Sequence, residues 1–258
     1  MPLIDPTMEE AKILLAGDFG SVFSKIATMY ATVLYWSTER EAYGTNEKLR
    51  NGTTFFMDCG KGVFGVTAGH VYDVFVEHAN TGGRCQIGQS QQLFDLRERL
   101  IARGKRVDIA TFRIATTEIS LTGATILTGW QREWPPKPPA LDKGVIFAGF
   151  PGVERKMIGP REIEFGIYSG LGTATSVNDR DISCLIEHEY AVPTKDWALA
   201  PVGYDLAGMS GGPMLAVVQN EVMGWRLAGV IYECGRSLLE VVKAARADYI
   251  RDDGTIEE

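Results

Sequence analysis

Segment 134–139, with the sequence Trp-Pro-Pro-Lys-Pro-Pro, constrains the fold more than any other feature of the chain. Proline fixes an extended backbone and lacks the N–H donor that a helix or an interior strand requires, so we predict a linker at residues 130–140. Runs rich in β-branched and aromatic residues lie on both sides of it, at residues 32–36, 53–58, 63–67, 109–114, 145–150, 164–170, 185–190, 214–218 and 227–232. The chain is therefore predicted to be all-β, with β-rich parts at residues 30–129 and 141–236.

Helical spacing of apolar residues is found near both ends of the chain. Residues 7–29 place apolar side chains on helical faces, with a break at residues 17–20, so a helical extension is predicted over residues 1–29. Leu238, Val241, Val242 and Ala245 also recur at helical spacing. This pattern predicts a C-terminal helix, followed by an acidic tail, over residues 237–258.

Composition excludes several classes of partner. The 258 residues are 45% hydrophobic and 23% charged, which is typical of a globular protein. A formal net charge of -7 argues against nucleic acid, because phosphate binding depends on clustered Lys and Arg. No run reaches the roughly 20 apolar residues of a membrane span, and the N-terminus lacks a secretory-signal pattern. We expect no nucleic-acid partner, no membrane partner and a cytoplasmic location.

The cysteines and histidines do not form a metal-binding pattern. Cys59, Cys85, Cys184 and Cys234 are widely spaced, and in a reducing compartment we expect four free thiols. Cys234 has no histidine motif beside it and is interpreted as a packing residue rather than a nucleophile. His188, between two glutamates, is interpreted as a surface histidine. With neither a CxxC nor an HExxH motif, we expect no metal and no other cofactor.

Two of the motifs suggest general-base chemistry. His70 follows an apolar run in Val-Thr-Ala-Gly-His-Val, residues 66–71, and Asp108 opens the run Asp-Ile-Ala-Thr-Phe, residues 108–112. A carboxylate at the edge of an apolar strand needs a hydrogen-bond donor, and an imidazole N–H supplies one while fixing the tautomer of a general base. Each residue also has a plain structural interpretation, His70 as an isolated histidine and Asp108 as a turn or strand cap.

The third motif is Gly-Met-Ser-Gly-Gly-Pro at residues 208–213, and it is the most specific signal in the chain. Glycines around Ser210 allow a sharp turn and the close approach of a substrate carbonyl. The N–H groups of Gly208 and Ser210 can then converge on the carbonyl oxygen as an oxyanion hole. The alternative is a glycine-rich turn that merely holds a serine.

In this order, TAGHV, DIATF and GMSGGP closely resemble the three active-site blocks of trypsin/chymotrypsin-like serine peptidases, most similar to a bacterial intracellular type. The resemblance covers about residues 30–250. It implies a chymotrypsin-like double β-barrel of two six-stranded antiparallel barrels, with His70 as general base, Asp108 as its orienting carboxylate and Ser210 as nucleophile. It also implies a serine endopeptidase that cleaves a protein or peptide substrate through an acyl-enzyme.

The chain departs from the family's secreted members at the nucleophile turn. Met209 stands where those members have an aspartate that pairs with a newly formed N-terminus. Other packing, around Met209, must then order the turn, or an activating partner must order it on binding, in which case the enzyme is latent until activated. The helical extension is either such a regulator or a simple packing element.

The resemblance places the primary substrate pocket near Tyr204, Asp205, Tyr232 and Glu233, which are therefore predicted substrate-binding residues. Asp205 or Glu233 would favour basic substrate side chains through charge-assisted hydrogen bonds, or would simply be solvated.

Two other functions compete with a peptidase. One is a catalytically silent module that binds a peptide or partner on the same fold, against which the intact set of motifs argues. The other is an esterase, but most α/β-hydrolase esterases use a GxSxG motif with the histidine last, whereas here the histidine comes first.

Overall fold

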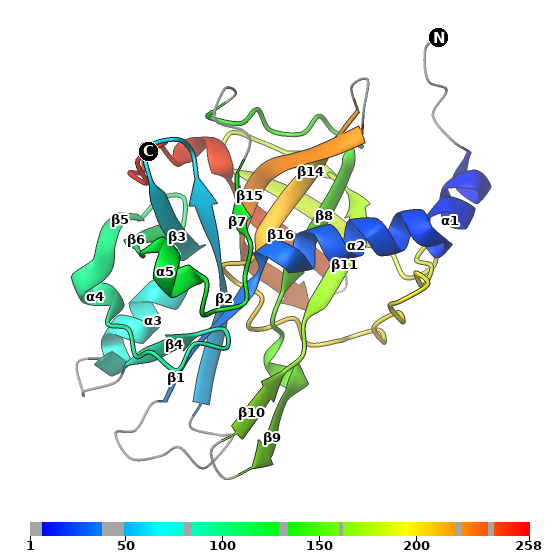
Figure 1. Ribbon diagram of the computed structural model, residues 1–258. Helices are drawn as coiled ribbons and strands as arrows, with labels where there is room; N and C mark the ends of the chain where they lie inside the picture. The colour runs from blue at the N-terminus through cyan, green and yellow to red at the C-terminus, as the bar shows by residue number, and fades with distance from the viewer. Residues whose placement is uncertain are drawn as a thin grey trace.

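The computed structural model describes residues 7–37, 49–79, 84–128, 134–159, 162–219, 223–236 and 240–258. The protein is mainly β, and its strands form two large sheets that are antiparallel except for one short strand (Figure 1). The prediction of a β-rich protein is confirmed, but the fold is mainly β rather than all-β, since helices are present as well.

The first sheet has the strand order β4-β1-β2-β3-β6-β5, and β7 pairs in parallel with β2. Its strands are β1 (Thr32–Ser37), β2 (Leu49–Asp58), β3 (Val63–Ala68), β4 (Cys85–Ile87), β5 (Leu100–Gly104), β6 (Ile109–Arg113) and β7 (Ile126–Leu127). Three helices lie between them in the chain, α3 (Gly69–Ala79), α4 (Leu96–Arg99) and α5 (Thr116–Ile119). Helix α3 buries Val71 and Phe75 in a cluster with Phe56 and Phe112, which fixes the helix on one face of this sheet.

The second sheet has the order β11-β8-β14-β15-β16-β13-β12. Its strands are β8 (Gly144–Gly149), β11 (Tyr168–Thr173), β12 (Ser176–Val177), β13 (Asp181–Ile186), β14 (Pro213–Gln219), β15 (Met223–Arg236) and β16 (Glu240–Arg246). A 3₁₀ turn at Gly152–Glu154 leads into a separate hairpin of β9 (Arg155–Gly159) and β10 (Glu162–Phe165). Another follows β16 at Ala247–Tyr249.

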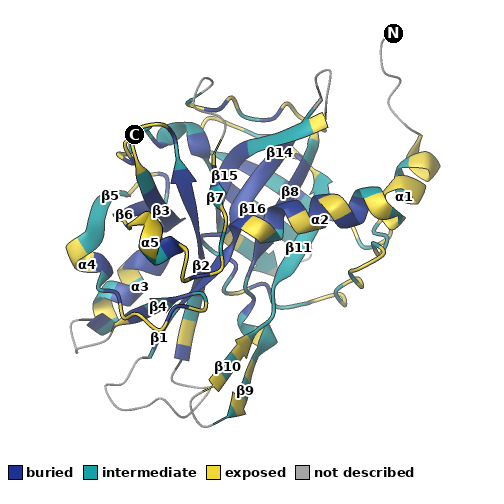
Figure 2. Cartoon of the chain, in the orientation of Figure 1, coloured by how far each residue is buried: buried dark blue, intermediate teal, exposed yellow. Residues whose placement is uncertain are grey.

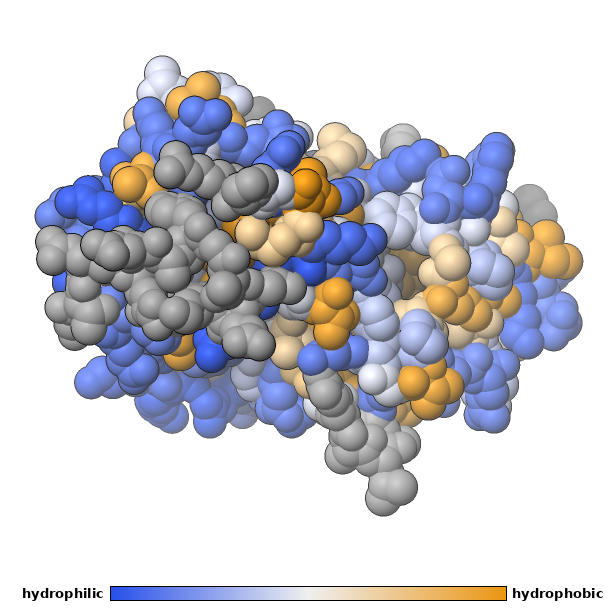
Figure 3. All heavy atoms as spheres, turned by 90° about the horizontal axis from the view of Figure 1, so that it is seen from below, coloured by the Kyte–Doolittle hydropathy of each residue, from blue (hydrophilic) through white to orange (hydrophobic). Residues whose placement is uncertain are grey.

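Two helices precede the sheets, α1 (Met8–Ala16) and α2 (Asp18–Tyr30), and they meet at Gly17. The predicted helical segment is present, but its break is at Gly17 alone, because α2 begins at Asp18 and includes Gly20. Residues 1–6 of the predicted extension lie outside the described part of the chain. Helix α2 packs its apolar face, with Phe23 and Ile26, against β8 and β11. Helix α1 has no buried residue, and hydrophobic side chains lie on the surface at its end of the molecule (Figure 3).

One hydrophobic cluster joins the two sheets. It contains Phe55 and Val66 from the first sheet together with Leu215 and Val230 from the second, all of them fully buried. In Figure 2 the buried residues concentrate on the strands where the sheets face each other. Residues 134–143 between the sheets form neither helix nor strand. The site described below lies where the two sheets meet.

The predicted C-terminal helix is wrong. Residues Glu240–Arg246 form β16, and residues 237–239 lie outside the described part of the chain. Strands β13 and β15 pair with β16 on either side, so its backbone hydrogen bonds are satisfied between strands. Val242 and Ala244 are buried with a period of two. The apolar residues of this segment come as two adjacent pairs, at 241–242 and 244–245, and such pairs fit the spacing of a helix as well as that of a strand.

Two other strand predictions need correction. The run predicted at 164–170 is divided between β10 and β11, which belong to different sheets and are separated by Gly166 and Ile167. The run predicted at 185–190 ends as a strand at Ile186, and residues 187–206 contain no helix or strand.

The implied pair of closed six-stranded barrels is not seen. Each large sheet has seven strands in the described residues, and its pairing there runs from one edge strand to the other without closing. The edge strands β4 and β12 are short, with three and two residues.

Candidate active site

His70 and Asp108 come together because of the register between β3 and β6. Ala68 at the end of β3 pairs with Ile109 at the start of β6, so the residues just beyond the two strands are neighbours. The N–H of Gly69 donates to the backbone oxygen of Asp108 at 2.8 Å, which continues the ladder by one step. Helix α3 begins at Gly69 and places His70 in its first turn.

The carboxylate of Asp108 makes two contacts with His70. Its Oδ2 lies 2.7 Å from Nδ1 of the imidazole, and its Oδ1 accepts a hydrogen bond from the backbone N–H of His70 at 2.8 Å. Both side chains are partly exposed, by 46% and 27%. A neutral imidazole that donates Nδ1–H to a carboxylate has Nε2 as its acceptor nitrogen. The arrangement therefore leaves Nε2 as the basic atom.

Ser210 lies on a tight turn between Leu206 and β14. Met209 N–H donates to Leu206 O, and Gly212 N–H donates to Met209 O. Gly208 and Gly211 have φ angles of 105° and 92°, in the region that only glycine adopts readily. A Cβ on Gly211 would lie 1.9 Å from the oxygen of Thr53, so the turn needs glycine there for space as well.

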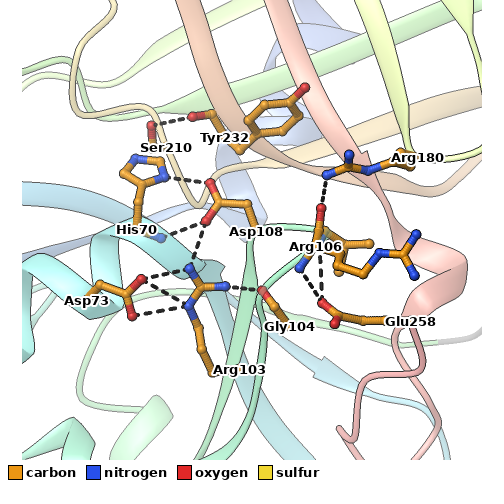
Figure 4. Close-up of polar contacts among 11 residues, drawn as sticks. His70, Asp73, Arg103, Gly104, Arg106, Asp108, Arg180, Ser210, Tyr232 and Glu258 are labelled. Atoms are coloured by element: carbon orange, nitrogen blue, oxygen red, sulfur yellow. Dashed lines mark hydrogen bonds and ion pairs between the residues drawn. The ribbon is translucent and has the colours of Figure 1, made fainter.

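Figure 4 shows the Ser210 side chain beside the imidazole of His70, with Asp108 on another side of the ring. The Ser210 hydroxyl donates to the backbone oxygen of Tyr232 at 3.4 Å. Among the hydrogen bonds of the described residues, none joins Ser210 to His70. The structure thus brings the three predicted residues to one place, with the hydroxyl turned toward Tyr232.

The predicted oxyanion donors are Gly208 and Ser210. Among the hydrogen bonds of the described residues, neither backbone N–H donates to a protein acceptor. Their oxygens are occupied instead, because Thr53 Oγ1 donates to Gly208 O at 2.9 Å and Thr53 N–H donates to Ser210 O at 2.8 Å. Two backbone donors in one turn remain available to a ligand oxygen.

Thr53 was not predicted as a site residue. It lies on β2 of the first sheet, yet it holds the serine turn of the second, and its hydroxyl also accepts from Phe150 N–H at 3.0 Å. Nearby, Asn51 Nδ2 donates to Phe150 O at 2.8 Å. A threonine in a β-rich run carries no sequence signal for such a role.

Met209 is fully buried, in a cluster that includes Leu206, Met214 and Ile231. Apolar packing thus holds the residue before Ser210, which fits one of the two alternatives that the sequence left open, packing around Met209.

The four predicted substrate-binding residues differ in position. The backbone oxygen of Tyr232 accepts the hydrogen bond from the Ser210 hydroxyl, and the side-chain hydroxyl of Tyr232 donates to Asp181 at 3.4 Å. Burial, then the charges of Asp181 and Glu233, raises the pKa of Tyr232 to about 12. Glu233 is exposed and pairs with Lys243 at 3.0 Å, which fits the solvated alternative.

Tyr204 and Asp205 lie on the segment that leads to the serine turn. The Tyr204 hydroxyl donates to Glu154, and its ring stacks on Tyr168 with centroids 5.6 Å apart. Burial and the Glu154 contact raise the pKa of Tyr204. Asp205 Oδ1 accepts from Ala207 N–H at 2.9 Å. Tyr204 also lines a cavity of about 350 Å³ between α1, β11, β13 and residues 187–206, and neither His70 nor Ser210 lines it.

All four cysteines are free thiols. Burial, then the charge of Glu233, raises the pKa of Cys234 to about 12, so its thiolate is scarce at neutral pH. Within the described ranges, no three potential ligands among His, Cys, Asp and Glu gather as a metal-binding group. No helix there is long and apolar enough to cross a membrane.

No protein-family model matches the chain, and no curated protein matches it. The chain is similar to a solved structure described as a thermostable serine protease from an extremophilic microorganism, with a TM-score of 0.44 and 14% identity over 85% of this chain and 92% of that one. It is also similar to a structure described for the intrinsically disordered VPg protein of Sesbania mosaic virus, with a TM-score of 0.44 and 13% identity over 87% and 94%. Likeness at this level assigns no activity, so the assignment depends on the geometry of the site.

Proposed function

We propose that the chain is a serine endopeptidase of the trypsin/chymotrypsin type, with His70, Asp108 and Ser210 as its catalytic triad. The two-point contact of Asp108 with His70 is the observation that carries the proposal. An aspartate that merely caps the start of α3 would need only the contact to the backbone N–H. The second contact, to Nδ1, orients the ring, and Ser210 lies beside that same ring (Figure 4).

The reaction is acyl transfer. The Ser210 hydroxyl turns from Tyr232 O toward Nε2 of His70, which takes its proton as Oγ attacks the peptide carbonyl. Protonated His70 then gives that proton to the leaving amine, and Asp108 stabilises the imidazolium while it exists. Water repeats the sequence on the acyl-enzyme and regenerates the Ser210 hydroxyl.

The N–H groups of Gly208 and Ser210 act as the oxyanion hole in this proposal. They stabilise the negative oxygen of the tetrahedral intermediate, and one such donor is typically worth about 2.7 to 4 kcal/mol in the transition state. Thr53 and the buried Met209 hold the turn in the described conformation, which favours a site assembled without an activating partner.

The test is covalent labelling with a fluorophosphonate probe, which phosphonylates an activated serine. The native chain should be labelled at Ser210, located by mass spectrometry, and should cleave an unfolded protein such as casein. Ser210→Ala and His70→Ala should abolish labelling, because one removes the nucleophile and the other its base.

His188→Ala is the matched control, since His188 also pairs with a carboxylate, Glu240, at 2.8 Å. It should be labelled at the native rate. Absence of Ser210 labelling in a folded native chain would overturn the peptidase and leave the silent binding module. Labelling that survives His70→Ala unchanged would overturn the triad.

A further inference from the structure

We infer that Arg103, braced by Asp73, is a positioning residue for the His70–Asp108 pair, an inference that rests on the proposed peptidase function. Arg103 lies on β5, and none of the sequence motifs includes it. Its Nη2 lies 3.3 Å from Oδ1 of Asp108 and 2.7 Å from Oδ2 of Asp73. Its Nε lies 3.2 Å from Oδ1 of Asp73, so the guanidinium is held in a fork (Figure 4).

The Arg103 contact helps to fix the orientation of the Asp108 carboxylate. Oδ1 receives two donors, the backbone N–H of His70 and the guanidinium of Arg103, whereas Oδ2 receives only the ring. Because the two oxygens are equivalent, these contacts fix the plane of the carboxylate, and a partial rotation of that plane would break both contacts of Oδ1. Arg103 therefore holds Oδ2 toward Nδ1 and, through it, the ring toward Ser210.

The backbone of Asp108 is also unusual for a residue with a side chain. Its φ angle is 51°, in the left-handed region that L-residues with a Cβ seldom adopt. Its side chain is 27% exposed, so water can compete for the carboxylate oxygens. A charge-assisted hydrogen bond from Arg103 to Oδ1 holds the carboxylate in one orientation against that competition.

The surrounding structure is shaped to hold the guanidinium. The Arg103 side chain is only 17% exposed. A Cβ on Gly69 would lie 2.1 Å from Cζ of Arg103, so the residue before His70 must be glycine for the arginine to fit. Nη1 donates to the oxygen of Gly104, and Asp73 lies one helical turn after His70 on α3. Arg103 is thus enclosed by the elements that carry the pair.

The charges around the pair come from several elements. Arg103 of β5 contacts Asp108 directly, and Asp73 of α3 contacts Arg103. On the turn before Asp108, Glu258 accepts from the backbone N–H of Arg106 at 2.7 Å, and Arg180 donates to the oxygen of Arg106. Removal of the Arg103 charge therefore leaves the carboxylates of Asp73 and Asp108 without the cation that they share.

Two substitutions separate the charge of Arg103 from its geometry. Arg103→Met should lower the rate of fluorophosphonate labelling at Ser210 by roughly 10- to 100-fold, the scale of a small misplacement of a catalytic group. It should also move the acid limb of the pH–rate profile to higher pH, because the uncompensated carboxylates stabilise the imidazolium. Arg103→Lys keeps the charge but loses the fork, so it should lower the rate and leave the acid limb in place.

A double variant and a control substitution at a second arginine complete the experiment. Asp73→Asn together with Arg103→Met restores the net charge beside His70, and the acid limb should return while the rate stays low. Arg99→Met is the control, because Arg99 makes a similar fork to Glu118 at 2.8 Å, away from the pair. It should label at the native rate, and thermal unfolding of each variant checks that it is folded.

A proton spectrum separates failure of this inference from failure of the proposed function. In chain labelled with ¹⁵N-histidine and carrying Ser210→Ala, the Nδ1–H of His70 should give a slowly exchanging, strongly downfield proton resonance, assigned by its loss in His70→Ala. Arg103→Met and Arg103→Lys should weaken or remove it, and Arg99→Met should not. If the resonance, labelling rate and pH profile are all unchanged in both Arg103 variants, the inference is wrong. If the native chain never labels, the peptidase proposal fails, and the resonance alone still decides whether Arg103 positions the pair.

Discussion

The described residues contain two histidine–carboxylate pairs, His70 with Asp108 and His188 with Glu240, which differ in the ring nitrogen that the carboxylate contacts. Asp108 lies 2.7 Å from Nδ1 of His70, whereas Glu240 lies 2.8 Å from Nε2 of His188. The second carboxylate also accepts from Gly203 N–H at 2.6 Å. In the first pair the nitrogen opposite the carboxylate lies on the side of Ser210. In the second pair, Nε2 is the ring nitrogen that the carboxylate contacts.

This difference shows that a short distance between histidine and carboxylate does not define a catalytic pair. Ile186 of β13 pairs with Glu240 of β16, and His188 follows two residues later, so the second pair ties the segment after β13 to the sheet. No glycine turn presents a hydroxyl to that ring within the described chain. The first pair differs from it in its neighbours, which are a serine turn and a braced arginine.

The largest expected effect comes from neutralising each carboxylate in turn. Asp108→Asn should lower the rate of peptide cleavage by about 10⁴-fold, because the amide cannot hold the Nδ1–H tautomer that leaves Nε2 basic. Glu240→Gln should leave cleavage unchanged. Initial rates with one peptide substrate at neutral pH measure both. Equal losses in the two variants would show that the pairs are functionally alike, contrary to the comparison.

A second pair of substitutions replaces one glycine near each histidine–carboxylate pair, Gly208 near the first and Gly203 near the second. Gly208 has φ 105°, and a Cβ there would lie 2.6 Å from Phe150 O, so Gly208→Ala must distort the turn that carries the oxyanion donors. We expect a loss of roughly 10²- to 10³-fold in kcat, the scale of one lost donor. Gly203 has φ 77° with open space around it, so Gly203→Ala should cost about 1 kcal/mol of stability and no activity. A native kcat in folded Gly208→Ala would contradict the proposed oxyanion hole.

The sequence predicted the contact within the first pair but not the contact within the second, for a physical reason. The motifs around the three residues His70, Asp108 and Ser210 can be recognised locally, because a strand end and a tight turn determine which neighbouring residues are glycine or apolar. His188 was interpreted as a surface residue, yet it is partly buried against a residue 52 positions away. That contact depends on strand β16, a segment that the helical spacing of its apolar residues had led us to predict as a helix. Thr53 and Arg103 were missed likewise, because only strand register brings them to the site.

Substitution of Thr53, which links the two sheets, should have a smaller effect. Thr53→Val keeps the shape but leaves Gly208 O and Phe150 N–H without their partner, at a cost of about 1 to 3 kcal/mol in the free energy of unfolding. Labelling at Ser210 should also slow, because the turn loses a tether. Thr54→Val is the control, since its buried hydroxyl donates to Val66 O at 2.7 Å and not to the serine turn. Denaturant unfolding should show both variants destabilised, and only Thr53→Val should slow labelling.

The smallest effect is the pH dependence contributed by Glu240. Burial alone would raise the pKa of its carboxyl, but the hydrogen bonds from Gly203 N–H and His188 outweigh burial, so the pKa of Glu240 lies below its usual range. A carboxyl whose pKa is lowered in the folded state stabilises that state above the unfolded value, about 4.3, and loses this contribution as pH falls through the folded value. The difference in unfolding free energy between the native chain and Glu240→Gln should therefore shrink as the pH falls below about 4.3. A difference that grows as the pH falls below that value would mean that the carboxylate is not held by His188 and Gly203, and the second pair would lose its structural role.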